Sequence, residues 1–204
     1  MFNTKEKKER SLGVRLFLKA DRCSGAKCAV VRNPFRPGAH GKDRRRALSE
    51  VGQQLQEKQK VQYSYGIRET YLRKVFEVAS KNPGVTGEMI ISTLERRLDN
   101  VVYRFGFTPS RSVARQLVGH GHFLVNGKRV NIPSYLVKPG DIIKIRPQSK
   151  EHIVFKDLEA NFKKSEAPIW LTRDNEKIEG KVSSQPKDYD ISFDINMIVD
   201  YYSK

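Results

Sequence analysis

The sequence predicts an α+β protein with three parts: a basic, extended N-terminal arm at residues 1–46, a helical domain at 47–94, and an αβ domain at 95–189. Prolines and glycines interrupt the arm, apolar residues recur at helical spacing from residue 71 to 105, and an Asn-Gly pair separates two β-favouring triplets near residue 126. We expect residues 190–204 to complete the helical domain. Residues 95–157 should form a compact module of two helices and a small sheet that contains a hairpin.

The arm is rich in residues that break regular structure. Asn33 to Gly41 holds two prolines and two glycines in nine residues, which excludes a continuous helix or a central strand. Four cations follow at once: Lys42, Arg44, Arg45 and Arg46. The pattern predicts an arm that orders fully only on its partner.

Three helices are expected between residues 48 and 106. The first is the polar run around Leu55, which is expected to face solvent or a bound partner. The second ends before Asn82-Pro83-Gly84, and the third begins after Thr86-Gly87. The apolar stripes of the second and third helices are Tyr71, Leu72, Val75, Phe76 and Ala79, and Ile90, Leu94, Leu98, Val101 and Phe105.

A fourth helix should run from Ser110 to about Val118, with Thr108 as its N-cap and Pro109 at the first helical position. At about 100° per residue, its side chains separate into two faces. The apolar face holds Val113, Ala114, Leu117 and Val118, and the cationic face holds Arg111, Ser112, Arg115 and Gln116.

Turn signals organise the rest of the chain. Asn126-Gly127 predicts a type I′ hairpin, and Lys138 to Asp141 has the proline and glycine of a type II turn that leads into a strand at 142–145. We expect a short helix around 155–166 and strand fragments at 168–171 and 178–182. Residues 196–203 could form a closing helix or a strand, and we favour the helix.

The net charge of +16 is unevenly distributed. Residues 1–50 carry +9, 51–100 carry +2, 101–150 carry +8 and 151–204 carry −3. Two separated basic blocks on one chain indicate a long or folded polyanion as the partner. No apolar run is long enough to span a bilayer, and two cysteines do not make a disulfide scaffold, so we expect a cytoplasmic protein with no membrane partner.

The block at 101–150 has the features of a phosphate-binding surface. Arg111 lies in the first turn of its helix, where the helix dipole disfavours a cation unless a phosphate binds there too. Arg115 follows one turn later, and Lys128 and Arg129 flank the hairpin turn. Helix and hairpin together are expected to hold a nucleic-acid backbone from two sides.

No catalytic motif accompanies these cations. His120 and His122 have no nearby acid, because Asp141 is the only Asp or Glu in residues 101–150, and no nucleophile elbow or phosphate loop is present. We therefore expect no enzyme, and we assign this histidine pair to stacking on RNA or hydrogen bonding with it.

At this point several segments resemble the bacterial type of the small-subunit ribosomal protein four family. They are LERRLDNVVYR at 94–104, SRSVARQLVGHGH at 110–122 and FLVNGKRVNIPSYLVKPG at 123–140, with RPGAHG at 36–41, QLQEKQK at 54–60 and DINMIVDYYSK at the end. The resemblance covers nearly the whole chain, and it depends on the order and spacing of the motifs.

The resemblance implies a structural constituent of the ribosome that binds the five-prime domain of small-subunit (16S) rRNA and nucleates subunit assembly. It implies contacts with neighbouring small-subunit proteins, an influence on decoding accuracy, and a lining of basic residues in the channel through which mRNA enters, at Lys42, Arg44, Arg45 and Arg46. No homo-oligomer is expected. RNA contacts are implied at Arg104, Arg111, Arg115, Gln116, His120, His122 and Lys128. We add Arg129 and the further cations Arg22, Lys27, Arg32, Lys58, Lys60, Arg68 and Arg73 as candidates.

The sequence departs from the zinc-bearing members of that family. Those have a Cys-x2-Cys pair before the one that matches Cys23 and Cys28, and here Glu6 and Glu9 stand at the first two positions. Two thiolates with two carboxylates are a poor set for structural zinc, so we expect a degenerate half-site with free thiols and no cofactor, unless His40 folds back as a third ligand.

Two other classes of protein remain open on the residues alone. A free-standing RNA-binding or RNA-modifying protein could carry the same module, but fewer than fifty residues follow position 157, too few for a catalytic domain. A DNA-binding regulator could place an arginine-faced helix in a major groove, against which the long basic arm argues.

Overall fold

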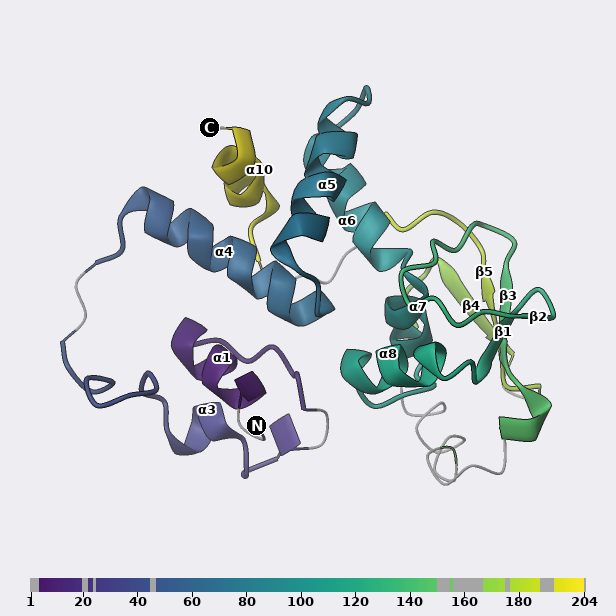
Figure 1. The fold of residues 1–204 in the computed structure, drawn as a ribbon, viewed down its shortest axis with the longest axis horizontal. Coiled ribbons are helices and arrows are strands. Elements are labelled where there is room, and N and C mark those ends of the chain that lie inside the picture. Colours follow the sequence, from purple (N-terminus) through teal and green to yellow (C-terminus); the bar gives the residue numbers. More distant parts are fainter. Residues whose placement is uncertain are drawn as a thin grey trace. The chain divides into compact units, whose positions relative to one another are not determined.

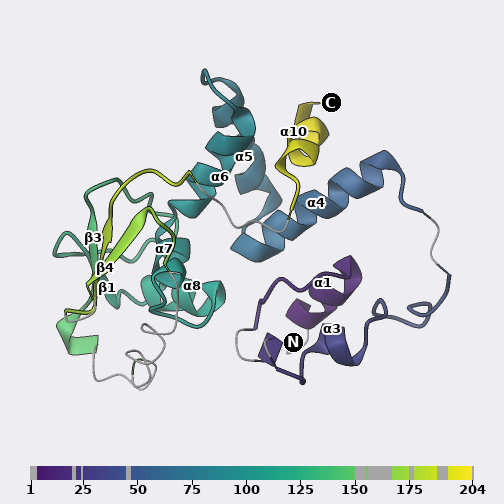
Figure 2. The ribbon, with the colours of Figure 1, turned by 180° about the vertical axis from the view of Figure 1, so that it is seen from behind.

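The computed structural model describes residues 4–19, 22–23, 25–44, 47–149, 155, 167–174, 177–187 and 193–203. The chain divides into two compact units, one of Met1–Gly87 with Ile191–Lys204 and one of Glu88–Asp190. Figures 1 and 2 show both from opposite sides, with the purple, blue and yellow elements in the first unit and the green sheet in the second. No helix among the described residues is long and apolar enough to cross a membrane.

The N-terminal arm is more folded than the sequence indicated. Helix α1 spans Thr4–Leu12 and the short helix α3 spans Ala29–Arg32, whereas residues 33–44 contain neither helix nor strand, as predicted. The arm has a small core, in which Leu12, Leu16, Cys23 and Cys28 are each at most 5% exposed. The arm is therefore extended only in part, because its few buried apolar residues come from separate segments and are interspersed with charged ones.

Three helices make up most of the rest of the first unit: α4 (Glu50–Tyr65), α5 (Glu69–Ser80) and the closing helix α10 (Ile195–Ser203), all three predicted. Ser49 caps α4 by accepting from the Gly52 amide, and Gly66 ends it in the left-handed conformation. Helix α10 lies along α4 in both views.

The predicted third helix is two helices. Helix α6 (Thr86–Glu95) and helix α7 (Leu98–Arg104) are separated at Arg97, whose backbone is extended and forms a β-bridge with Leu136. The Leu98 amide donates to the Tyr135 carbonyl at 2.8 Å. This long-range pairing overrides local helix propensity, although every residue of the expected stripe is buried.

Helix α8 (Arg111–Gly119) follows the predicted faces but not the predicted cap. The hydroxyl of Ser110, not of Thr108, accepts from the Val113 amide at 3.4 Å, so α8 begins two residues later than the Thr-Pro signal indicated. Ala114, Leu117 and Val118 are buried, Val113 is half-buried, and Ser112, Arg115 and Gln116 are exposed, which confirms the split into an apolar and a polar face.

An antiparallel sheet of five strands completes the second unit. The strands β1 (Phe123–Val125), β2 (Lys128–Arg129), β3 (Ile142–Ile145), β4 (Leu171–Asp174) and β5 (Glu179–Val182) lie in the order β2-β1-β3-β5-β4. One 3-10 turn spans Pro147–Ser149. Asn126 and Gly127 have φ of 51° and 78°, which confirms the type I′ hairpin.

One core joins this sheet to α7 and α8, which lie on the same side of it in both views. Its residues include Val101, Phe105, Leu117, Phe123 and Ile143, each at most 4% exposed. The helix expected at 155–166 lies outside the described residues except for Phe155, which is buried in this core.

Candidate nucleic-acid interface

Two arginines of α8 project from the module on its polar face. Arg115 has 49% of its side chain exposed, and Arg111 is half-buried at the first helical position. The first turn of α8 contains no acidic residue. The start of this helix thus combines the positive end of the helix dipole with a guanidinium, and both attract a phosphate.

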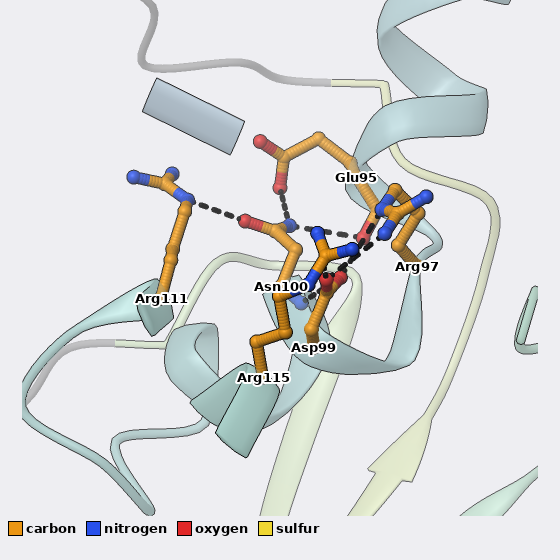
Figure 3. A network of polar contacts seen from close by, with 6 residues as sticks. All are labelled: Glu95, Arg97, Asp99, Asn100, Arg111 and Arg115. Atoms are coloured by element: carbon orange, nitrogen blue, oxygen red, sulfur yellow. Dashed lines mark hydrogen bonds and ion pairs between the residues drawn. The ribbon is translucent and has the colours of Figure 1, made fainter. Parts of the chain in front are cut away.

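Arg111 is held in place by two neighbours from α7. Its Nε donates to the Asn100 side-chain oxygen at 2.7 Å, and its guanidinium lies 4.6 Å from the centre of the Tyr103 ring. Figure 3 shows the Arg111 side chain extended towards Asn100. A guanidinium fixed by a hydrogen bond and a cation–π contact loses little entropy when it binds a further ligand.

Asn100 connects Arg111 to a buried carboxylate. Its amide nitrogen donates to the Glu95 side chain at 2.8 Å and to the Glu95 carbonyl at 3.0 Å, which leaves its oxygen for Arg111. Glu95 is 1% exposed, and its carboxylate also accepts two hydrogen bonds from Arg104, at 2.9 and 3.0 Å. This charge is buried but fully partnered, as a buried carboxylate must be.

A second buried carboxylate, that of Asp99, is 4% exposed and is linked to the first through Asn100 (Figure 3). It accepts from Arg97 at 2.9 and 3.2 Å and from the Asn100 backbone amide at 2.9 Å, and Arg115 Nη1 lies 3.8 Å from its Oδ2. We call these seven residues the arginine network: Glu95, Arg97, Asp99, Asn100, Arg104, Arg111 and Arg115.

The arginine network holds four guanidinium groups against two carboxylates, so it keeps a net positive charge. The carboxylates are internal, whereas Arg115 and part of Arg111 face outward. Such an arrangement supplies positioned donors for an anion.

The hairpin adds a second group of donors. Lys128 and Arg129 are exposed on β2, and Arg129 Nη2 donates to the carbonyl of the exposed His120 at 3.1 Å, which ties the hairpin to the end of α8. Gly121 makes this approach possible, because a Cβ there would lie 2.2 Å from Arg129 Nε. His122 is half-buried, and its Nδ1 lies 3.0 Å from the Ser149 hydroxyl.

The structure places some predicted contact residues inside the fold. Arg104 supports Glu95 with 18% of its side chain exposed. Lys58 is only 7% exposed, forms an ion pair with Glu69 at 3.1 Å and lies 4.2 Å from the Tyr201 ring centre, so it fastens α10 to α4 and α5. Lys60 is paired with Glu57. These three side chains support the fold, and their direct RNA contacts stay predictions.

The other candidates are surface groups, and their RNA contacts stay predictions. Arg22 pairs with Glu6 at 3.2 Å, and Arg73 with Glu77 at 3.4 Å, with the larger part of the Arg73 side chain exposed. The remaining exposed candidates are Lys27, Arg32, Lys42, Arg44, Arg68 and Gln116. Arg45 and Arg46 lie outside the described residues.

Sequence reasoning missed the residues that position the arginines. Glu95, Asp99, Asn100 and Tyr103 stand in the LERRLDNVVYR segment, where they were read as part of a family signature with no individual role. The available signal was the two acids in an otherwise basic stretch, since acids there are expected to pair with arginines.

The residues around Cys23 and Cys28 do not fit a metal. Glu9 is 1% exposed, and its Oε1 accepts from the amides of Leu16 and Leu18 at 3.1 Å, while Cys23 Sγ lies 3.7 Å from its Oε2. Glu6 is paired with cations, and the exposed His40 faces Asp43 at 2.8 Å. In the described part of the chain, no three His, Cys, Asp or Glu residues are grouped as metal ligands.

Fold and site together define an RNA-binding protein with a basic binding surface. Residues 2–95 match the model of the ribosomal protein S4/S9 N-terminal domain, and residues 96–143 match that of the S4 domain. The chain is 51% identical over 197 residues to small ribosomal subunit protein uS4 of Caldicellulosiruptor bescii and 52% identical over the same length to protein uS4A of Alkaliphilus oremlandii. Each alignment covers 96% of this chain and 94% of the relative. The chain belongs to the uS4 family of small ribosomal subunit proteins.

Proposed function

We propose that this protein is a structural component of the small ribosomal subunit that binds the five-prime domain of small-subunit rRNA and nucleates assembly there. The observation that carries the proposal is the arginine network, which presents positioned guanidinium groups beside an exposed hairpin. Phosphates bound at the start of α8 would complete a site whose polar face is otherwise solvent-exposed.

A ribosomal role also accounts for the second basic region. Two separate basic regions, in different units of one chain, suit an RNA in which several helices meet better than they suit one straight duplex. The same reasoning disfavours a DNA-binding regulator.

Filter binding tests the proposal. The full chain is titrated with a five-prime-domain transcript of small-subunit rRNA and with duplex DNA of equal length, at one physiological salt concentration. We expect at least about 1,000-fold tighter binding to the rRNA, in the range that separates specific from non-specific sites. Equal affinity for the two would refute the ribosomal assignment.

We propose that the turn after α3 contacts mRNA where it enters the subunit. Lys42 and Arg44 line a cavity of about 480 Å³ with Phe35, which is 47% exposed, and Lys42 Nζ lies 5.7 Å over the Phe35 ring. An exposed aromatic ring among cations is the arrangement that binds single strands. In reconstituted subunits, Lys42→Ala/Arg44→Ala should alter misreading frequency, and misreading equal to that of the wild type would remove this role.

We propose further that the arm folds without zinc, because the Glu9 carboxylate accepts the backbone amides that fix the turn after α1. Elemental analysis of the purified protein should find much less than one zinc per chain, and chelation should leave the circular dichroism unchanged. Stoichiometric zinc would contradict this. We also propose that the protein is cytoplasmic and bound to the ribosome, and that the free protein is a monomer. Sedimentation of the free protein tests its oligomeric state.

A further inference from the structure

The N-terminal unit contains a cavity of about 210 Å³ that the arginine network does not explain. Five of its lining residues are cations: Lys7, Arg10, Arg22, Lys27 and Arg32. They come from α1, from α3 and from the chain between these two helices. At about 30 Å³ per water molecule, the cavity has room for about seven waters, or for a phosphate group with part of its hydration shell.

The one acid at this cavity, Glu6, does not neutralise it. Glu6 is 7% exposed and pairs with both Lys19 and Arg22 at 3.2 Å. Lys7, Lys27 and Arg32 are exposed, and among the described residues no carboxylate forms an ion pair with them. A positive potential therefore remains in the cavity.

The walls of the cavity are fixed before any ligand binds. Arg10 Nε donates to the carbonyls of Asn33 and Phe35, both at 3.0 Å, which joins α1 to the loop after α3. Glu9, which precedes Arg10 on α1, accepts hydrogen bonds from the backbone amides of Leu16 and Leu18, both at 3.1 Å. Little reorganisation is needed to bring the cations together, which favours binding.

The lining chemistry selects the kind of anion. Apart from Ala29, every lining residue is charged or polar, and no aromatic ring lines the cavity. The cavity therefore offers little apolar surface for an apolar peptide side chain. Guanidinium and ammonium groups in a small polar cavity match the oxygens of a phosphate.

We propose that this cavity, which we call the α1–α3 phosphate site, binds a phosphate of the RNA backbone. Lys7, Lys27 and Arg32 contact the phosphate oxygens, and Arg10 and Arg22 hold the walls and add positive potential. This proposal rests on the proposed rRNA binding, and it adds a distinct contact in the other unit of the chain.

The test uses the full chain with Lys7→Ala/Lys27→Ala/Arg32→Ala, three exposed side chains outside the core. The control, Lys74→Ala/Lys81→Ala/Lys187→Ala, removes the same charge at other exposed positions. Affinity for the five-prime-domain transcript is measured from about 50 to 200 mM salt. Over this range, phosphate contacts account for most of the change in affinity with salt. We expect the site variant to bind at least about tenfold more weakly, with the log–log salt slope reduced by about 0.7–0.9 per lost phosphate contact. The control variant should show less than half of this decrease in affinity and in salt slope.

The outcomes separate this inference from the function beneath it. If the wild type prefers rRNA to duplex DNA but the site variant behaves as the control does, the phosphate site is refuted and rRNA binding stands. If the wild type shows no preference, the proposed function has failed, and the site loses its basis.

Inorganic phosphate is titrated separately by isothermal calorimetry. Phosphate binding by the wild type without any RNA defect in the variant also refutes an RNA contact. A Lys7→Arg/Lys27→Arg variant, which keeps the charge, should retain RNA affinity, and its failure to do so would likewise count against the site.

Discussion

The ion pair between Glu95 and Arg104 should be the main anchor of the arginine network. We consider Glu95→Gln, which keeps the shape of the side chain and removes its charge. Glu95 is 1% exposed, and Arg104 donates to it at 2.9 and 3.0 Å. The substitution leaves Arg104 facing a neutral amide and replaces one acceptor oxygen by a donor.

The structure sets the expected magnitude. At roughly 4 Å and an effective dielectric constant near 20, the attraction between two such charges is about 4 kcal/mol. Removing one partner of a buried pair costs about 3–5 kcal/mol. Because Arg104 keeps 18% of its side chain exposed, we expect the lower end of this range, a decrease of about 3 kcal/mol in the free energy of unfolding. Glu95→Gln/Arg104→Gln should recover part of this, with a coupling energy of about 2 kcal/mol.

Urea unfolding measures this change in stability, followed by the fluorescence of Trp170. Trp170 is the only tryptophan and is 3% exposed in the same core as α7. With an m value of about 2 kcal/mol/M, the midpoint should fall by about 1.5 M. The control is Glu179→Gln, since Glu179 is more exposed and pairs with Lys144 at only 3.7 Å. It should cost at most about 1 kcal/mol. If Glu95→Gln costs no more than this control, Glu95 does not anchor the network.

Three further predictions follow from other parts of the fold. Gly180→Ala would place a Cβ 2.4 Å from Phe105, so we expect it to cost about 1–3 kcal/mol in the same unfolding assay, and no loss would mean that the ring has room to move. Burial raises the pKa of the Cys23 thiol, so at neutral pH its alkylation should be slower than that of a free cysteine and should speed up on unfolding. Equal rates in the folded and unfolded chain would contradict this burial. Burial tends to raise the pKa of Glu69, but hydrogen bonds, the largest from Tyr202, outweigh it and lower the pKa. A lowered pKa stabilises the fold above the ordinary carboxyl pKa, and this contribution is lost as the pH falls through the lowered value. Thermal unfolding followed by circular dichroism should therefore show a loss of stability in acid that is smaller in Tyr202→Phe, and identical acid profiles would exclude the contribution.

The parts of the fold that local patterns specify were predictable. The two faces of α8 follow from the spacing of Val113, Ala114, Leu117 and Val118, and the hairpin follows from the need for positive φ at Asn126 and Gly127. Both signals act within a few residues of the structure that they determine.

The parts set by distant contacts were not predictable. The break between α6 and α7 depends on the pairing of Arg97 with Leu136, which lies far along the chain. Lys58 was assigned to RNA because it is a cation on a polar helix, but the tyrosines of α10 and Glu69 enclose it. Charge alone does not distinguish a cation that faces solvent from one that holds two helices together.

The same limit applies to the candidate site. The cationic face of α8 was visible in the sequence, whereas the support of Arg111 by Asn100 and Tyr103 arises where α7 and α8 pack together. Hydrogen bonds among side chains on neighbouring helices leave no periodic signal.

The most direct test of the RNA-binding surface is the affinity of Arg111→Ala/Arg115→Ala for the five-prime-domain transcript. Each lost charged contact should cost about 1.5–3 kcal/mol, so the double variant should bind at least about 100-fold more weakly, with Trp170 fluorescence unchanged. The control, Lys177→Ala/Lys187→Ala, removes equal charge from exposed positions of the same unit and should stay within about threefold of the wild type. If the folded arginine variant binds rRNA as tightly as this control, the arginine network does not bind RNA.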